Sequence, residues 1–368
     1  MKITIIYQRD SHFKATRLLR VAFLRNGHQV EEYSYEDLML ENGSKSFLSS
    51  EVVLLSCGGK AINAIIDVIK KYHKNVGKRP VIITNFPGIV VESQLEAFIT
   101  RLRSDFVLLN SRKDEKIYRK VCKVFGIEFN GFMIGALWHT TCLEKNLKKN
   151  RAATIFYEQE QVPKEYSDRV VVAQTLLKLA EQNPNRFFYI KNRGNELVDT
   201  SIFSILQSLV IKLPDNIGIF NGDVEEALLA SDRCITVSSS VALEALLCEQ
   251  HVILINVGDL KDNHLEFFKS SGLLVAPSDL NSATTKKANH QWLFENVSNP
   301  NKYIDTFMSV LHDSTKHMTQ PVSEIVVQRL YIRAGLLLSF PFTYLSNFFW
   351  IDKKVNSALN VIQGERYV

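Results

Sequence analysis

The 368-residue sequence has few cysteines, and they lack the spacing of a metal site. All five lie in apolar or helical segments, and none falls in a Cys-x-x-Cys or Cys/His zinc pattern. We expect them to be reduced and mostly buried. The composition, 46% hydrophobic and 23% charged, is ordinary for a globular protein. This excludes disorder, collagen-like repeats and a coiled-coil rod as descriptions of the whole chain.

The N-terminus lacks the features of a secretory leader. Its short β-branched run stops at Gln8-Arg9-Asp10, without a long apolar stretch or a small-residue cleavage site, so we expect a first strand and a cytoplasmic protein. The formal charge is +5, which favours phosphate-bearing or anionic-membrane partners. We expect no nucleic-acid partner, because the basic run over residues 145–151 has no interleaved aromatic residues.

One apolar segment, residues 334–351, has nearly the length of a membrane span. Pro341 and several polar residues interrupt it, and basic residues lie at both ends. Three interpretations stay open for the C-terminal residues 331–368. These residues form helices that clasp the domains, helices that dock on the surface of a bilayer, or a helix that spans the membrane.

β-branched runs alternate with helical segments at the spacing of βαβ units, in two successive series. The first has predicted strands over residues 3–7, 28–33, 52–56, 81–84 and 106–109 and helices over 14–25, 59–72, 93–103 and 114–125. The second has predicted strands over 154–157, 187–191, 234–237, 252–256 and 273–276 and helices over 167–182, 223–231, 239–248 and 264–270. Each series predicts an α/β, doubly wound parallel sheet.

The polar, basic stretch 141–152 is the best candidate for a linker, so we expect Rossmann-like domains over residues 1–140 and 153–330. Two such halves with C-terminal helices describe the GT-B architecture. Glycosyltransferases and sugar-nucleotide epimerases share it and bind ligands in the cleft between the halves, at the carboxyl ends of the strands.

Three serines, Ser238, Ser239 and Ser240, join a predicted strand to a predicted helix. Hydroxyl groups and free amides at a helix N-terminus suit an anion, so this segment predicts a phosphate cradle for a nucleotide-sugar donor. The alternative is simple N-capping. Glu244, one turn into the helix, is a candidate for binding a ribose or sugar hydroxyl, or it neutralises local positive charge.

Two further groups follow strands of the second half. Lys191 and Arg193 come at a strand end and are candidates for binding the anionic donor, unless they form a solvated basic loop. Gln159 and Glu160 follow the first strand of this half and could hydrogen-bond donor or acceptor hydroxyls. Alternatively, their loop is a well-satisfied turn into the next helix.

The first half offers candidates for the acceptor side. Transfer to a hydroxyl needs a base, and Asp10, His12 and Glu92 follow predicted strands. The cleft-facing loop after residue 84 supplies Asn85, Pro87 and Gly88. The Cys57–Lys60 segment lacks the spacing of a P-loop or a Gly-x-Gly-x-x-Gly fingerprint, so we do not assign it a nucleotide.

No cofactor or metal is expected. The histidines are dispersed, and the absence of an Asp-x-Asp motif argues against the metal-chelating diphosphate site of the other large glycosyltransferase architecture.

Several of these segments together resemble a known family. They are IFYEQEQVPKEYSDR and NPNRFFYIKNRG within residues 154–194, the serine segment with SSGLL within 219–275, FPG at 86–88, and R-x-x-SD-x-x-LLNS at 101–111. They are similar to bacterial GT-B glycosyltransferases found with surface-polysaccharide genes, over most of residues 80–280. More distantly, the serine segment resembles that of capsular Kdo-transferases and sialyl- or polysialyltransferases, which use CMP-activated acidic sugars.

The resemblance implies that Ser238–Ser240 hold the donor phosphate. It also implies a capsule- or lipopolysaccharide-type glycan or glycolipid acceptor, with possible peripheral contact at the cytoplasmic face of the inner membrane. Sialyltransferases of this kind carry a His-Pro pair that this sequence lacks, and Lys191 and Arg193 are candidates for its electrostatic role. A sugar-nucleotide epimerase and a non-catalytic scaffold of a polysaccharide assembly complex are the alternatives.

Overall fold

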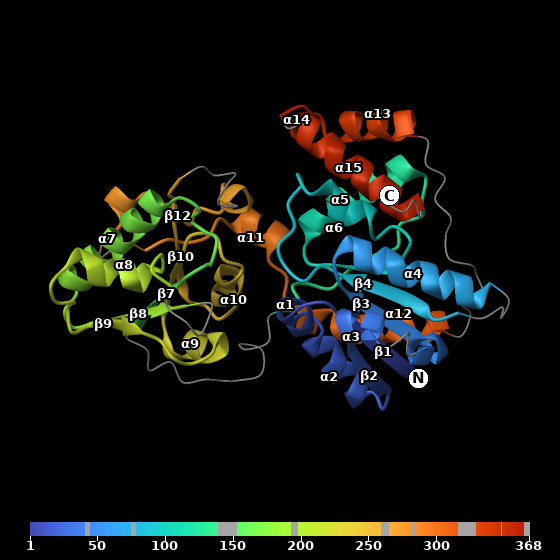
Figure 1. Ribbon diagram of the computed structural model, residues 1–368, viewed down its shortest axis with the longest axis horizontal. Helices are drawn as coiled ribbons and strands as arrows, with labels where there is room; N and C mark the ends of the chain where they lie inside the picture. The colour runs from blue at the N-terminus through green and yellow to red at the C-terminus, as the bar shows by residue number, and fades with distance from the viewer. Residues whose placement is uncertain are drawn as a thin grey trace. The chain divides into compact units, whose positions relative to one another are not determined.

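The computed structural model describes residues 1–40, 45–74, 79–138, 153–192, 198–258, 265–281, 285–315, 329–346 and 348–363. The chain divides into two compact units, Met1–His139 with Phe294–Val368, and Thr140–Leu293 (Figure 1). Each contains one six-stranded parallel sheet, which confirms the two predicted Rossmann-like halves. The predicted linker lies outside the described residues.

The first sheet has the strand order β2-β1-β3-β4-β5-β6. Its strands are β1 (Lys2–Tyr7), β2 (Gln29–Ser34), β3 (Val52–Ser56), β4 (Val81–Asn85), β5 (Phe106–Leu109) and β6 (Gly131–Met133). All residues of β3 and β4 are buried, as expected for central strands covered on both faces. After β2, which pairs with one edge of β1, the chain adds β3 and the later strands on the other side of β1, so the sheet has a topological switch point between β1 and β3. In open α/β sheets, ligands bind at such switch points.

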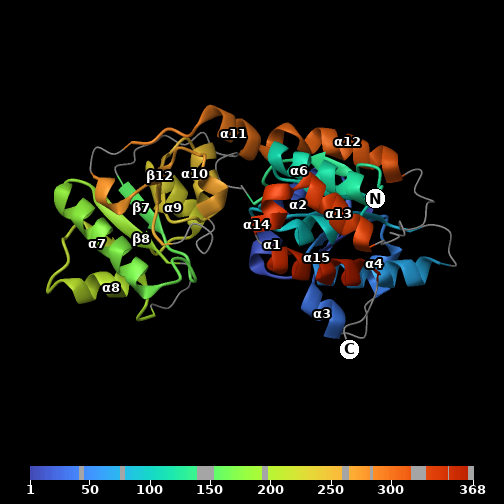
Figure 2. The ribbon, with the colours of Figure 1, turned by 90° about the horizontal axis from the view of Figure 1, so that it is seen from above.

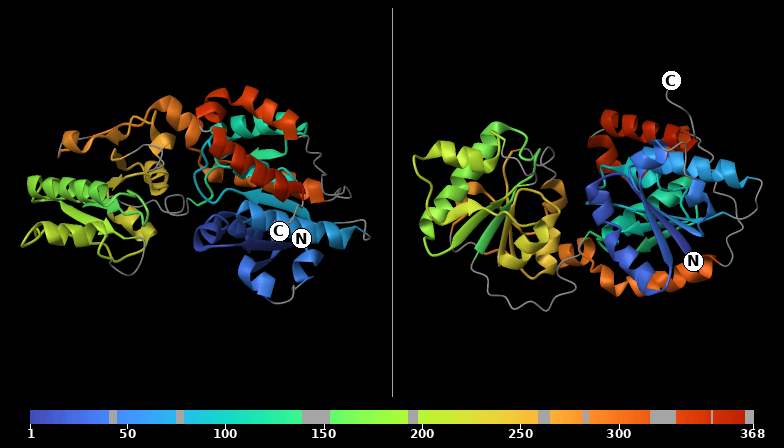
Figure 3. Two further views of the ribbon diagram at one scale, coloured as in Figure 1. Left: turned by 45° about the horizontal axis from the view of Figure 1, so that its top comes forward. Right: turned by 60° about the horizontal axis from the view of Figure 1, so that its bottom comes forward.

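The second sheet has the order β12-β11-β10-β7-β8-β9. Its strands are β7 (Ala153–Tyr157), β8 (Phe187–Lys191), β9 (Ile217–Ile219), β10 (Arg233–Thr236), β11 (His251–Ile255) and β12 (Leu274–Val275). The switch point here lies between β7 and β10. Figure 3 shows the strands of each sheet side by side, with helices on both faces.

Helices connect and cover the strands. Those of the first unit are α1 (Asp10–Lys14), α2 (Arg17–Arg25), α3 (Tyr35–Leu40), α4 (Gly59–His73), α5 (Leu95–Ile99), α6 (Arg112–Phe125), α12 (Ile304–Thr315), α13 (Arg329–Ser339), α14 (Pro341–Ser346) and α15 (Phe348–Gln363). Those of the second unit are α7 (Tyr166–Gln182), α8 (Ile202–Leu209), α9 (Val224–Ala230) and α10 (Val241–Leu247). The chain returns to the first unit within α11 (His290–Asn296).

This return moves the end of the second unit from the predicted residue 330 to Leu293. The reason is apolar packing by α12, which lies against α2. The Phe307 ring of α12 is 5.9 Å from the ring of Phe106 and 5.1 Å from that of Phe132, measured between ring centroids. Burial of large aromatic side chains therefore holds this late helix on the first sheet.

The C-terminal helices also pack on the first unit. Leu336, Phe340 and Leu359 are buried in one apolar cluster with side chains of α5 and α6, and Figure 2 shows α15 beside α4. A Cβ at Gly335 would lie 2.9 Å from Val124 Cγ1, so glycine permits the close approach of α13 to α6. In the described part of the chain, no helix has both the length and the apolar character that a membrane span requires.

The described cysteines differ in state. Cys57, Cys122 and Cys234 are buried free thiols, as predicted. Cys248 is disulfide-bonded, which corrects the expectation that all five are reduced. Cys142 lies outside the described residues.

Candidate functional site

In the second unit, two predicted loops meet at the switch point between β7 and β10. Gln159 follows β7 and Ser238 follows β10, and Gln159 Oε1 accepts hydrogen bonds from the backbone amide of Ser238 at 3.0 Å and from its hydroxyl at 3.4 Å. Ser238 is itself buried. It therefore ties the two loops together, whereas the next two serines are less buried.

Ser239 and Ser240 are half-buried at the start of α10. The Ser239 hydroxyl accepts from the Val241 amide at 3.4 Å, whereas the Ser240 side chain makes no capping hydrogen bond. Glu244 lies half-buried in the first turn of the same helix. The predicted serine segment thus places two hydroxyl groups at the carboxyl end of a central strand.

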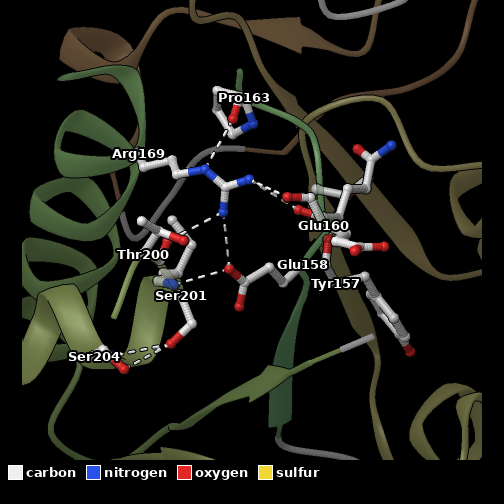
Figure 4. Close-up of polar contacts among 11 residues, drawn as sticks. Tyr157, Glu158, Glu160, Pro163, Arg169, Thr200, Ser201 and Ser204 are labelled. Carbon is white, nitrogen blue, oxygen red and sulfur yellow. Dashed lines mark hydrogen bonds and ion pairs between the residues drawn. The ribbon is translucent and has the colours of Figure 1, made fainter. Parts of the chain in front are cut away.

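Arg169 of α7 holds the loop that follows β7 (Figure 4). Its guanidinium donates to the carbonyl oxygens of Pro163 at 2.9 Å and Glu160 at 2.5 Å, and to a carboxylate oxygen of Glu158 at 3.3 Å. The Glu158 carboxylate also accepts from the Ile202 amide at 2.9 Å. The loop is therefore a well-satisfied turn, as one of the two sequence interpretations predicted.

Glu158 was not predicted as a site residue, although its environment is unusual. Burial raises the pKa of its carboxyl, and the Ile202 amide and Arg169 partly oppose this effect. Both members of the Glu158–Arg169 ion pair are buried. The pair positions Gln159, because the loop between them carries that side chain.

The remaining second-unit candidates differ in their surroundings. Lys191 ends β8, and its ammonium donates to the Asn192 carbonyl oxygen at 3.1 Å. Glu160 is exposed. Arg193 lies outside the described residues.

In the first unit, His12 lies at the switch point between β1 and β3. Ser56, the last residue of β3, donates its hydroxyl to the His12 carbonyl oxygen at 2.9 Å. His12 lines a cavity of about 410 Å³ together with Pro87 and the Cys57–Lys60 segment. Burial, and then the charges of Arg9 and Arg101, lower the pKa of His12 to about 4, so its imidazole is neutral near pH 7.

The other two candidate bases, Asp10 and Glu92, have different surroundings. Asp10 is exposed at the start of α1, and Glu92 accepts a hydrogen bond from the hydroxyl of Thr343 in α14. Neither lines the cavity. Of the three candidate bases, only His12 lines this cavity in the described structure.

The acceptor-side prediction needs a correction at Asn85. This residue is fully buried, and its side-chain amide donates to the Ala15 carbonyl oxygen at 3.0 Å. It therefore joins β4 to the segment after α1 and is not available to a ligand. Gly88 accepts from the Asn110 side chain through its carbonyl at 3.0 Å, which leaves Pro87 as the predicted residue on the cavity wall.

Several cavity residues were not predicted as site residues. They come from α4, α5, the segment after α5 and α15, and include Lys60, Glu96, Arg101 and Lys354. Two signals were present in the sequence. Glycines 58 and 59 separate a buried strand from a long helix, and Arg101 begins the R-x-x-SD-x-x-LLNS motif.

Among the described residues, no group of three or more histidine, cysteine or acidic side chains could hold a metal ion.

Comparisons with known proteins agree with this architecture. Residues 13–311 match the model of the family described as "Putative glycosyltransferase (DUF6716)". No curated protein has a significantly similar sequence.

Among solved structures, the UDP-GlcNAc 2-epimerase of Methanocaldococcus jannaschii has a TM-score of 0.51 at 10% identity, covering 85% of this chain and 100% of its own. The MnaA–UDP structure from S. aureus has a TM-score of 0.51 at 11% identity, covering 94% and 97%. The wall teichoic acid polymerase TagF has a TM-score of 0.50 at 10% identity, covering 87% and 90%. These likenesses show the fold, which is GT-B, and the family match covers most of the chain: the protein belongs to this glycosyltransferase family.

Proposed function

We propose that the protein transfers a sugar from a nucleotide-sugar donor, held by the second unit, to a hydroxyl of a surface-glycan acceptor, held by the first. The Gln159–Ser238 hydrogen bond carries the donor part of this proposal, because it joins the predicted donor loops at the switch point of their sheet. Ser239 and Ser240 would hold the donor phosphate, with Glu244 and Lys191 as further contacts.

The chemistry assigns one role to each unit. His12 accepts the proton of the acceptor hydroxyl while the acceptor oxygen bonds to the sugar carbon. The bond from that carbon to the donor phosphate breaks, and the nucleotide leaves with the added negative charge. Hydroxyl and amide donors beside Ser239 and Ser240 stabilise that charge where it develops, so the proposed reaction needs no metal.

The proposed donor is a CMP-linked acidic sugar such as Kdo or a nonulosonic acid. It rests on the resemblance of the serine segment and is tested by thermal shift with CMP, UDP and GDP and their sugars. A shift with the cytidine nucleotides alone supports it. Turnover of free UDP-sugar without an acceptor would instead indicate the epimerase alternative.

Replacing Ser239 by alanine is expected to weaken donor binding about 3- to 10-fold, because one hydrogen bond to a phosphate oxygen is lost. Calorimetric titration of the donor measures the change. Ser208→Ala is the matched control, because the Ser208 hydroxyl of α8 donates to the Ile205 carbonyl oxygen at 2.7 Å, away from the switch point. Equal affinities in the wild type and Ser239→Ala would remove the basis for the donor site.

We further propose that the protein docks on the cytoplasmic face of the inner membrane through α13 and α14. Four large apolar side chains are exposed on these helices, two on each at helical spacing: Tyr331 and Leu338 on α13, and Phe342 and Leu345 on α14. Leu338 is 82% exposed and Phe342 is 89% exposed. Beside them, the Lys120 ammonium reaches the Ser339 carbonyl oxygen at 3.4 Å, so the face combines apolar and cationic groups, as interfacial helices do.

The double variant Leu338→Ser with Phe342→Ser is expected to lower the partition onto phosphatidylglycerol vesicles at least about tenfold, since two large side chains leave the lipid. Co-sedimentation with vesicles measures this. Ile211→Ser, at an exposed isoleucine of the second unit, should leave the partition unchanged. A wild-type protein that does not bind these vesicles, or a double variant that binds them as well as the wild type does, would exclude this docking face.

A further inference from the structure

The cavity beside His12 has a wall of positive charge that the proposed transfer reaction does not use. It occupies about 410 Å³ at the carboxyl ends of β1, β3 and β4. Three cationic side chains line it, from three separate segments: Lys60, Arg101 and Lys354. One carboxylate, Glu96, lines it as well.

Arg101 is a buried cation without a carboxylate partner among the described residues. It is 4% exposed, and its guanidinium donates to three neutral carbonyl oxygens, those of Asn85 at 3.0 Å, Ala97 at 2.7 Å and Cys57 at 3.2 Å. The other three buried arginines in the described structure each pair with a carboxylate: Arg79 with Asp105, Arg103 with Asp67, and Arg169 with Glu158.

This difference matters because burying a charge without a counter-ion lowers the stability of the folded protein. A guanidinium has five N–H donors, and the three carbonyls of Arg101 account for three of them. Its face also lies 4.2 Å from the centre of the Phe86 ring, which supplies only partial compensation. Arg101 therefore keeps both net charge and donor capacity on the cavity wall.

The N-terminus of α4 adds to the positive potential. This helix has 15 residues and begins after Gly58, an N-cap residue that makes no side-chain capping hydrogen bond, so the positive end of its dipole lies at the cavity. A Cβ at Gly59 would lie 2.6 Å from Thr100 Cβ. Glycine thus lets the helix start approach the segment that carries Arg101.

Among the described residues, Glu96 is the only carboxylate that lines the cavity, and it is already engaged. Glu96 pairs with the Lys354 ammonium of α15 at 3.0 Å, and among the described residues no ion pair joins it to Arg101. His12 responds to the same environment, since the charge of Arg101 contributes to lowering its pKa. The Nδ1 atom of His12 is buried and has no hydrogen-bond partner among the residues that the structure describes.

We propose that this cavity binds an oxyanion carried by the acceptor sugar, a phosphate or a carboxylate, through Arg101, Lys60 and the first turn of α4. This inference rests on the proposed function only in taking the bound sugar to be the acceptor. The cavity volume suits an anionic group attached to a sugar ring, and the proximity of His12 would bring that sugar's hydroxyl to the base. The acceptor is accordingly an acidic or phosphorylated glycan.

Calorimetric titration with glucose 1-phosphate, glucuronic acid and glucose tests the proposal on the full chain. At least one of the two anionic sugars is expected to bind, and glucose at least about tenfold more weakly, because charge-assisted hydrogen bonds are lost. The stronger anion identifies the oxyanion as phosphate or carboxylate. Equal binding of all three, or no binding of either anion, would overturn the proposal.

Variants locate the site. Lys60→Gln and Arg101→Gln are each expected to weaken binding of the anionic sugar about tenfold or more. Lys71→Gln on α4 and Lys353→Gln on α15 are the controls, since both lysines are exposed and outside the cavity lining. Lys60 is also exposed, so its variant should fold even if Arg101→Gln does not, and unchanged binding in Lys60→Gln would contradict the site.

Donor titration separates this inference from the proposed function. Nucleotide affinity should be unchanged in Lys60→Gln, because the serine segment belongs to the other unit. If the anionic sugar binds at Lys60 and no nucleotide binds, the cavity site stands and the proposed transfer fails. If a nucleotide binds at Ser239 and no anionic sugar binds, the cavity site fails alone.

Discussion

His12→Asn is expected to lower the turnover number about 10²- to 10⁴-fold, the usual contribution of a general base, while donor affinity stays close to that of the wild type. The imidazole lines the cavity after β1, and its carbonyl oxygen is held by the Ser56 hydroxyl. Release of nucleotide from the donor, followed with acceptor present, measures turnover. The effect appears in kcat because the base acts in the transition state and does not hold the donor.

The pH dependence gives a second readout of the same group. Burial and two nearby arginines lower the pKa of His12 to about 4, so the basic form persists at every pH above that value. We expect kcat/KM to stay level from pH 8 down to about pH 5 and to fall only as the pH approaches 4. A histidine with the ordinary pKa of 6.5 would instead lose activity between pH 7 and 6.

Asp10→Asn and Glu92→Gln are the matched comparisons, because each removes a rival base without changing the size of the side chain. Asp10 is exposed, and Glu92 is engaged by Thr343, so both variants should keep turnover within about tenfold of the wild type. A larger loss in either variant than in His12→Asn would transfer the role of base to that residue.

Sequence patterns predicted the fold well where long apolar runs decide it. The central strands β3 and β4 and the helix α4 were predicted within one residue, because each buries a continuous run or a regular apolar face. The three-residue strands β6 and β9 were not predicted. They are too short to show alternation, and pairing with β5 and β8 supplies what their own sequences do not.

The candidate site divides in the same way. The Gln159 and Ser238 loops were predicted because each directly follows a recognisable strand, and parallel strands bring their carboxyl ends together. The cavity could not be predicted, because one of its lining residues, Lys354 of α15, comes more than 250 residues after Arg101 in the sequence. No local sequence pattern connects residues that far apart. What distinguishes Arg101 is a missing carboxylate, which is a property of packing in three dimensions.

Arg169→Met is expected to lower the free energy of unfolding of the second unit by about 3–5 kcal/mol, the usual cost of removing one partner from a buried ion pair. Both Arg169 and Glu158 are buried. The variant leaves the Glu158 carboxylate without its counter-ion and the carbonyl oxygens of Pro163, Thr200 and Glu160 without their donor. Urea unfolding measures the loss, and hydrogen exchange of peptides from β7 and α7 assigns it to the second unit.

The loss should depend on pH with a defined sign. Burial already raises the pKa of Glu158, and Arg169 opposes that rise. Without Arg169, the folded-state pKa lies further above the unfolded value, so protonation favours the folded variant. The destabilisation should therefore be smaller near pH 5 than near pH 8. Adding Glu158→Gln removes the titrating group, so the double variant should be more stable at pH 8 than Arg169→Met alone and should lose this pH dependence.

Lys212→Met is the control, because Lys212 and Asp215 form an ion pair on the surface of the same unit, with side chains 81% and 89% exposed. Solvent-exposed pairs contribute little, so no measurable change is expected there. A loss in Arg169→Met no larger than in Lys212→Met would mean that the loop after β7 keeps its shape without the guanidinium. Donor affinity then provides the deciding measurement, because Arg169 is expected to affect it by positioning Gln159 against Ser238. A stable Arg169→Met variant with unchanged donor affinity would show that the ion pair has no part in arranging the switch point.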